Sequence, residues 1–230
     1  VWSCLVSILP GMAQTEKLTD YVNPFVGTDG YGNVYPGAQI PFGGIQISPD
    51  TDSRFYDAAS GYKYNHLTLM GFSLTHLSGT GIPDLGDFLF IPGTGEMKLE
   101  PGTHEDPDQG YRSRYSHDKE WASPNYYAVE LADYGVKAEM TSGVRSGMFR
   151  FTYPESDNAF IMIDMNHTLW QSCEWSNLRM INDSTITGYK LVKGWGPERH
   201  VYFTATFSKK LTGLRFVQDK KPVIYNTSRF

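Results

Sequence analysis

The stretch YYAVELADYGVKAEMTSGVRSGMFRFTYP, residues 126–154, decides the fold class because it contains three apolar alternations in succession. Successive side chains of a β-strand point to opposite faces, so an alternation of period two predicts a half-buried strand. Turn residues separate the alternations, most clearly the pair Tyr134-Gly135. The stretch therefore predicts an antiparallel meander over residues 127–131, 136–140 and 149–153.

The rest of the chain continues this β pattern. Further strands are predicted at residues 88–91, 160–165, 185–190, 201–207, 214–217 and 223–225, whereas residues 50–64 and 96–121 are expected to be loops. No window of helical length keeps a period of 3.6, and turn signals recur about every ten residues. The pattern predicts an all-β fold, an antiparallel β-sandwich.

Composition and charge limit the classes of partner. The 230 residues include 20 basic and 25 acidic side chains, and aromatic residues make up 14% of the chain. A surface for nucleic acid would need a basic excess or a basic stripe, and the only dense basic runs are two lysine pairs. We therefore expect a folded domain that does not bind nucleic acid.

The N-terminal residues VWSCLVSILPGMA, 1–13, are typical of the end of a secretory signal peptide. The apolar run is too short to span a bilayer. We expect residues 14–230 to form the β-sandwich domain of a secreted protein, in the periplasm or at the cell surface. Cleavage after Ala13 would remove Cys4 and leave Cys173 as the only thiol, so no intrachain disulfide is expected.

The segment GFSLTHLSGTGIPDLGD, residues 71–87, concentrates glycines and polar side chains between two apolar runs. Glycine permits positive φ and close backbone approach, so the segment is a candidate wall of a binding site with His76 and Asp84 as its polar groups. The same composition is also ordinary turn chemistry. Asp84 and Asp87 have a spacing that could suit a pair of catalytic carboxylates, but we expect both to be structural and to accept backbone N–H groups in turns.

Signatures of the common enzyme classes are absent from the sequence. It contains no nucleophile elbow, no zinc-protease helix motif, no phosphate-binding loop and no dinucleotide fingerprint. Aromatic residues beside carboxylates in residues 50–64 could form a sugar-stacking platform or simply cap a core. Trp170, Trp175 and Trp195 are expected in the core or at an interface.

Eight motifs in one order resemble the N-terminal domain of the glycoside hydrolase family 92 α-mannosidases. They extend from residue 21 to residue 209, and their number and order make the resemblance specific. The motifs are YVNPFVGTDG, NVYPGAQIPFG, ISPDT, SGYKY, GFSLTHLSGTG, DLGD, YYAVELADYGVKAEMT and GWGPERHVYFTATFSK.

The resemblance implies a two-domain, calcium-dependent exo-acting enzyme that inverts the anomeric configuration of mannose-containing glycans. Its N-terminal β-sandwich would pack against a C-terminal (α/α)6 barrel, and the active site would lie between the two. The catalytic acid, the base and the calcium ligands would belong to the barrel, so we expect no catalytic or metal-binding residue in this chain and no hydrolysis by the chain alone.

The same resemblance implies substrate-binding roles for four residues of this chain. A backbone group of Gly37 would approach the terminal sugar, and Tyr56 would shape the subsite of the leaving sugar, where many members have tryptophan. His76 and Asp84 would lie at the wall between the domains. The alternative hypothesis is a stand-alone carbohydrate-binding module or surface glycan-binding protein that holds sugars through Tyr56 and its aromatic neighbours.

Overall fold

A computed structural model describes residues 16–53 and 56–223 of the chain. Within these residues the regular structure consists of β-strands and short 3-10 turns, with no α-helix. The strands are β1 (Ser48–Asp50), β2 (Thr68–Leu69), β3 (Gly71–Ser73), β4 (Leu89–Thr94), β5 (Ser113–Arg114), β6 (Glu120–Ser123), β7 (Tyr126–Leu131), β8 (Val136–Ser142), β9 (Gly147–Thr152), β10 (Ala159–Asp164), β11 (Ser172–Asn182), β12 (Thr185–Lys193), β13 (Arg199–Thr206), β14 (Phe216–Gln218) and β15 (Lys221–Val223). The 3-10 turns are η1 (Leu18–Tyr21), η2 (Tyr56–Ala58), η3 (Pro107–Gln109) and η4 (His117–Lys119).

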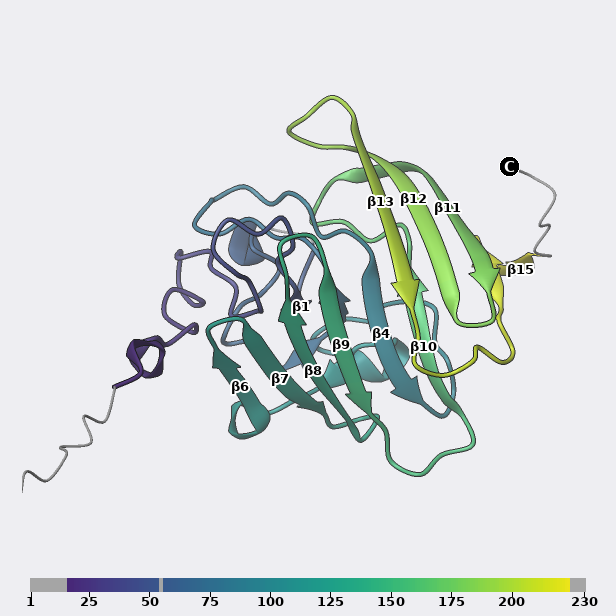
Figure 1. The fold of residues 1–230 in the computed structure, drawn as a ribbon, viewed down its shortest axis with the longest axis horizontal. Coiled ribbons are helices and arrows are strands. Elements are labelled where there is room, and N and C mark those ends of the chain that lie inside the picture. The colour runs from purple at the N-terminus through teal and green to yellow at the C-terminus, as the bar shows by residue number, and fades with distance from the viewer. Residues whose placement is uncertain (1–15, 54–55, 224–230) are drawn as a thin grey trace, which may run out of the picture.

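The strands form two layers. One layer is the sheet β1-β3-β4-β10, and the other contains the sheet β6-β7-β8-β9 and the sheet β11-β12-β13 (Figure 1). The two small pairs β2-β5 and β14-β15 lie outside these layers. All pairings between the strands are antiparallel. The chain is therefore an antiparallel β-sandwich, as predicted.

The main hydrophobic core lies between the sheet β1-β3-β4-β10 and the sheet β6-β7-β8-β9. Inward-facing side chains of β7 and β8 pack there against Ile47, Leu69 and Phe72. Tyr127 and Val129 of β7 and Val136 and Ala138 of β8 are completely buried. A second cluster covers the opposite face of β4 and contains Met70, Leu89, Ile91 and Tyr111.

The meander predicted from residues 126–154 is confirmed as β7, β8 and β9. The strands predicted near residues 88, 160, 185, 201 and 214 are also confirmed, as β4, β10, β12, β13 and β14. The last predicted strand is only partly testable, because β15 ends at residue 223 and residues 224–225 lie outside the described part.

Several strands were not predicted. Among them are β1, β2 and β3, which have only two or three residues each and cannot show an alternation; β1 also ends inside the expected loop 50–64. The sequence pattern missed β11, because this edge strand has irregular pairing between Cys173 and Trp175 and again between Met180 and Asn182, which breaks the alternation. The expected loop at residues 96–121 contains β5 and the start of β6. These strands are short and largely polar, so they show no apolar period.

The predicted signal peptide, residues 1–13, lies outside the described residues. Among the described residues, no helix is long and apolar enough to cross a membrane. Cys173 is half-buried and is not part of a disulfide.

Candidate functional site

The segment 71–87 folds back on itself between β3 and β4. His76 and Leu85 form an isolated antiparallel bridge, and the N–H of Gly86 donates to the carbonyl of Thr75 at 2.8 Å. Leu85 and Gly86 both have φ of 75°, and Phe88 has φ of 57°. Such values are uncommon for residues other than glycine, so the surrounding contacts must hold this backbone in place.

His76 lies inside the protein, at the centre of a buried charge cluster. Its Nε2 donates to Oδ1 of Asp50 at 2.7 Å, and Nε2 of His167 donates to the other oxygen, Oδ2, also at 2.7 Å. Both side chains of the His76–Asp50 pair are fully buried. Burial alone would raise the pKa of Asp50, but the charge of His76 and the hydrogen bonds from both histidines outweigh it and lower the pKa to about 2.

Both ring nitrogens of His76 have hydrogen-bond partners. Its Nδ1 donates to the carbonyl of Gln46 at 2.7 Å, since a carbonyl oxygen can only accept. Its Nε2 lies 2.7 Å from Oδ1 of Asp50 and 3.1 Å from the hydroxyl oxygen of Ser73. These three contacts fix the orientation of the imidazole ring.

A second ion cluster joins the segment 71–87 to the sheet β11-β12-β13. Asp87 accepts a hydrogen bond from the hydroxyl of Thr75 at 2.7 Å and pairs with Nζ of Lys190 at 3.0 Å and with the guanidinium of Arg199. Burial would raise the pKa of Asp87, but the charge of Lys190 and the hydrogen bond and charge of Arg199 hold it below its ordinary value. Lys190 also donates to the carbonyl of His167 at 2.6 Å, so the two clusters are continuous.

Asp84 fits the structural role that the sequence predicts. Its carboxylate accepts the backbone N–H of Leu85 at 2.6 Å and the backbone N–H of Trp195 at 3.1 Å. Asp87 is different, because its carboxylate binds side chains and not backbone N–H groups. The local sequence could not show this, since the cationic partners of Asp87 are more than 100 residues away in the chain.

Gly37 is held against β1 by the bridge between Ala38 and Ile47. A Cβ at position 37 would lie 2.0 Å from the carbonyl oxygen of Ile47, so only glycine fits there. The ring of Tyr35, two residues earlier, lies 5.1 Å from the ring of His76. The structure thus places Gly37 and His76 in one neighbourhood.

Tyr56 is the exposed member of the four predicted substrate-binding residues. Its side chain is 54% exposed, and its ring centroid lies 5.6 Å from that of Trp170, which is 56% exposed. The two ring planes are inclined by 49°. They form an aromatic pair that is open to solvent.

The segment 167–171 connects this aromatic pair to the segment 71–87. The N–H of Leu169 donates to the carbonyl of Leu85 at 2.9 Å, and the side-chain amide of Gln171 donates to the carbonyl of Pro83 at 3.2 Å. Trp170 itself has φ of 72°, so its exposed ring is carried by a strained backbone that these contacts hold in place.

Five segments therefore meet at one end of the sandwich, which we call the loop end. It consists of residues 35–38, residues 50–53 with Tyr56, residues 76–87, residues 167–171, and residues 194–199 with Lys190. The four predicted residues all belong to it: Tyr56 contributes an exposed ring, while His76 and Asp84 are 3% and 7% exposed and support the loops from inside.

Sequence reasoning missed several residues of the loop end. His167, Lys190 and Arg199 have no local signature, because their roles depend on partners brought together by the fold. For the three tryptophans, the expectation of a core position is wrong, since Trp170, Trp175 and Trp195 are 56%, 54% and 61% exposed, and the alternative position at an interface stays a prediction.

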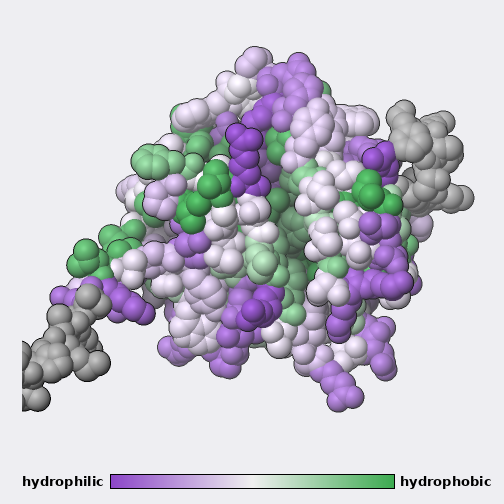
Figure 2. All heavy atoms as spheres, viewed as in Figure 1, coloured by the Kyte–Doolittle hydropathy of each residue, from purple (hydrophilic) through white to green (hydrophobic). Residues whose placement is uncertain are grey.

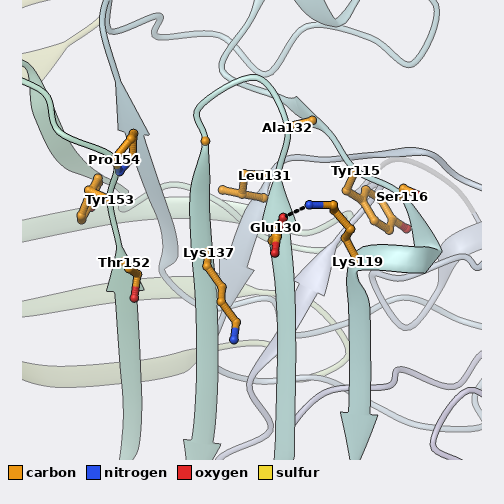
Figure 3. A pocket seen from close by; sticks show the side chains of 11 residues that line it. Tyr115, Ser116, Lys119, Glu130, Leu131, Ala132, Lys137, Thr152, Tyr153 and Pro154 are labelled. Carbon is orange, nitrogen blue, oxygen red and sulfur yellow. Dashed lines mark hydrogen bonds and ion pairs between the residues drawn. The ribbon is translucent and has the colours of Figure 1, made fainter.

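A separate hollow of about 630 Å³ lies at the edge of the sheet β6-β7-β8-β9 (Figure 3). Its walls include Tyr115, Lys119, Glu130 and Lys137, and Lys119 and Glu130 form an ion pair across it. None of the four predicted substrate-binding residues lines this hollow.

Comparison with known proteins identifies the family. The glycosyl hydrolase family 92 N-terminal domain matches residues 21–229. An uncharacterized secreted glycosidase of Arthroderma benhamiae is 30% identical over 139 residues, which are 60% of this chain and 17% of that protein.

Two solved structures are similar in fold and in sequence. The family GH92 glycosyl hydrolase ccman5 matches with a TM-score of 0.66 and 29% identity, over 81% of this chain and 26% of its own. The family GH92 inverting mannosidase BT2199 of Bacteroides thetaiotaomicron matches with a TM-score of 0.64 and 25% identity, over 83% of this chain and 25% of its own. The chain thus spans about a quarter of the length of these two proteins, and it belongs to glycosyl hydrolase family 92, whose N-terminal domain it contains.

Proposed function

We propose that this chain is the substrate-pocket half of a secreted, calcium-dependent exo-α-mannosidase that inverts configuration and acts on mannose-containing N-glycans. In this proposal the loop end faces a C-terminal (α/α)6 domain of the same protein, and the sugar binds between the two. Family membership and the mannosidase among the structural relatives support the substrate class.

The observation that carries the proposal is that some residues of the loop end are exposed to a ligand whereas others are buried and hold the loops in place. Tyr56 and Trp170 offer exposed rings, and an aromatic face suits the C–H face of a sugar ring. Gly37 lets the backbone of Ile47 and Ser48 pack directly against the segment 35–38. His76 and Asp84 position the loops from inside and do not offer free groups to a ligand.

The carboxylates of the loop end do not suit acid and base catalysis. An inverting glycosidase needs one carboxylic acid to protonate the leaving oxygen and one carboxylate to activate water, about 6.5–9.5 Å apart. Asp50 is held by two histidines, Asp84 by two backbone N–H groups and Asp87 by Lys190 and Arg199. The other two also have partners: Asp52 accepts the backbone N–H of Ser53 at 2.7 Å and pairs with His104 at 3.4 Å, and Glu198 pairs with His200. We therefore expect the acid and the base to come from the C-terminal domain.

The described residues also do not fit a calcium site. Calcium takes six to eight oxygen ligands, and the described part of the chain holds no cluster of three or more candidate side chains. The acidic loop EDPDQG, residues 105–110, loosely resembles a calcium-binding loop, but its acids have other partners: Asp108 pairs with Arg114 at 2.8 Å and Asp106 accepts from the side-chain amide of Gln109. In our proposal the C-terminal domain supplies the calcium ligands.

Mannose release tests the proposal. The protein encoded by the complete reading frame and the chain of residues 14–230 are each incubated with α-mannobiose, with calcium and with a chelator. We expect the complete protein to release mannose in a calcium-dependent way and the shorter chain to release none. The absence of release from a panel of α-linked mannobioses by the complete protein would refute the proposal.

A stand-alone glycan-binding module is the second candidate function. The exposed pair Tyr56 and Trp170 favours it, because two rings 5.6 Å apart could hold a sugar without a second domain. Isothermal titration of residues 14–230 with α-mannobiose separates the two hypotheses. Saturable binding by the isolated chain supports the module, and no binding at millimolar sugar counts against it.

Secretion is part of the proposal. The signal-like residues 1–13 and a relative described as a secreted glycosidase support it. N-terminal sequencing of the protein recovered from periplasm or medium tests it, with a mature start at Gln14 as the expected result.

A further inference from the structure

Two sheet edges face each other in one layer of the sandwich. Among the described residues, β9 pairs only with β8, and β13 pairs only with β12. No backbone hydrogen bond of the described loops reaches residues 147–152 or 199–206. Figure 1 shows β9 and β13 on either side of β4, with their arrows pointing toward the same end of the molecule.

Burial falls toward the space between these two edges. The inward-facing residues of β8 and of β12 are buried along the whole strand. On the edge strands beside them, β9 and β13, the inward-facing residues are only half-buried. They are Phe149 and Phe151 on β9 and Val201 and Phe203 on β13. Figure 2 shows apolar side chains exposed down the middle of this face.

The floor of the space is apolar too. Phe90 of β4 is paired with Ile163 of β10, so both side chains lie on the same face of their sheet. Ile161 lies two residues from Ile163 and shares that face, and both isoleucines are half-buried. The space between β9 and β13, which we call the groove, therefore has apolar side chains beneath it: the half-buried isoleucines of β10 and Phe90 of β4, which is 4% exposed.

One side chain of β4 contacts both edges, since the ring of Phe90 lies 5.1 Å from that of Phe149 and 6.1 Å from that of Phe203. Since β9 and β13 point the same way, one strand of opposite direction would be antiparallel to both.

The edges of β9 and β13 lack two of the features that protect exposed edges from pairing, bulges and proline. The outer edge β11 has two irregularities of register, and bulges of this kind discourage further pairing. The pairings of β9 and β13 are regular along their whole length, and neither strand contains proline. Each strand carries an arginine, Arg150 on β9 and Arg199 on β13, but Arg199 is engaged by Asp87. The regular backbone of both edges therefore leaves them able to pair with a further strand.

We propose that a β-strand from sequence beyond Phe230 lies between β9 and β13, antiparallel to both, and joins the sheets β6-β7-β8-β9 and β11-β12-β13 into one. The structural relatives are about four times as long as this chain, so the same polypeptide can supply the strand. Its alternate side chains are apolar, because they cover Phe90 and the two isoleucines of β10.

Hydrogen–deuterium exchange read by mass spectrometry tests the strand. The chain of residues 14–230 and the protein encoded by the complete reading frame are compared peptide by peptide. We expect amides of β9 and β13 to exchange at least about tenfold more slowly in the complete protein, while the outer edges β6 and β11 change little. If residues 14–230 do not fold alone, slow exchange of β9 and β13 relative to β6 and β11 within the complete protein is the expected result.

Three results would overturn the proposal. The first is equal exchange of β9 and β13 in both proteins, and the second is a reading frame that ends at Phe230. The third is protection that rises with the concentration of residues 14–230, because a second copy would then fill the groove. Mannose release is a separate measurement. Slow amide exchange in β9 and β13 without mannose release would support the added strand and reject the enzyme activity.

Discussion

Replacement of Asp50 by asparagine tests the buried charge cluster at the loop end. The amide of D50N has one accepting oxygen and one donating nitrogen, so it can satisfy only one of the two Nε2–H groups of His76 and His167. Removal of one partner from a buried ion pair costs about 3–5 kcal/mol. For a domain of this size that loss lowers the melting temperature by about 10 °C.

Thermal unfolding followed by circular dichroism at pH 7 measures the effect. The matched control is D108N, which makes the same chemical change in a carboxylate that is 74% exposed and paired with Arg114. We expect D108N to melt close to the wild type. Melting of D50N within about 2 °C of D108N would refute the conclusion that Asp50 holds the loop end together.

Four further predictions follow from the same geometry. First, the pKa of Asp50 is lowered to about 2 in the folded protein, against a value near 4 in the unfolded chain. The ionised carboxylate therefore stabilises the fold fully above about pH 5, and this contribution disappears as the pH falls toward 2. The urea midpoint should fall over that pH range in the wild type and much less in D50N. Second, K190M removes the ion pair between Lys190 and the buried Asp87, and urea unfolding should show that the free energy of unfolding falls by about 3–5 kcal/mol. Third, G86A places a Cβ 2.7 Å from Cγ of Leu169 at a φ of 75°, and urea unfolding should show a loss of about 2 kcal/mol. Fourth, Y56A should leave the melting temperature unchanged because the side chain is 54% exposed, yet reduce kcat/KM of the complete protein for α-mannobiose by about tenfold. A melting temperature that falls in Y56A, or unchanged stability in K190M or G86A, would contradict these assignments.

Most of the long strands could be predicted from alternation, whereas β1, β2, β3, β5 and β6, with two to four residues each, could not. The strands β7, β8 and β13 have one face in the core and one toward solvent, so their sequences show the period directly. The strand β11 could not be predicted, because its bulges shift the alternation and its place at a sheet edge leaves most of its residues partly exposed. Local pattern is informative only where one face of a strand is consistently buried.

The candidate site was predictable only in part. The glycines and the other turn residues of segment 71–87 can be recognised from the local sequence, and Asp84 accepts backbone N–H groups as expected. The ion clusters have none, because Asp50 and His167 are 117 residues apart and Asp87 and Arg199 are 112 residues apart. Such pairs are decided by topology, which the sequence pattern does not specify at the level of single side chains.

The central claim is that this chain shapes a mannose pocket whose catalytic groups lie in another domain. Assay of mannose release from α-mannobiose, with residues 14–230 and the protein of the complete reading frame side by side, tests it most directly. We predict release by the complete protein and none by residues 14–230. Release by residues 14–230 alone would contradict the account, because the chemistry would then have to come from carboxylates that the structure shows bound to histidine, lysine, arginine and backbone N–H groups.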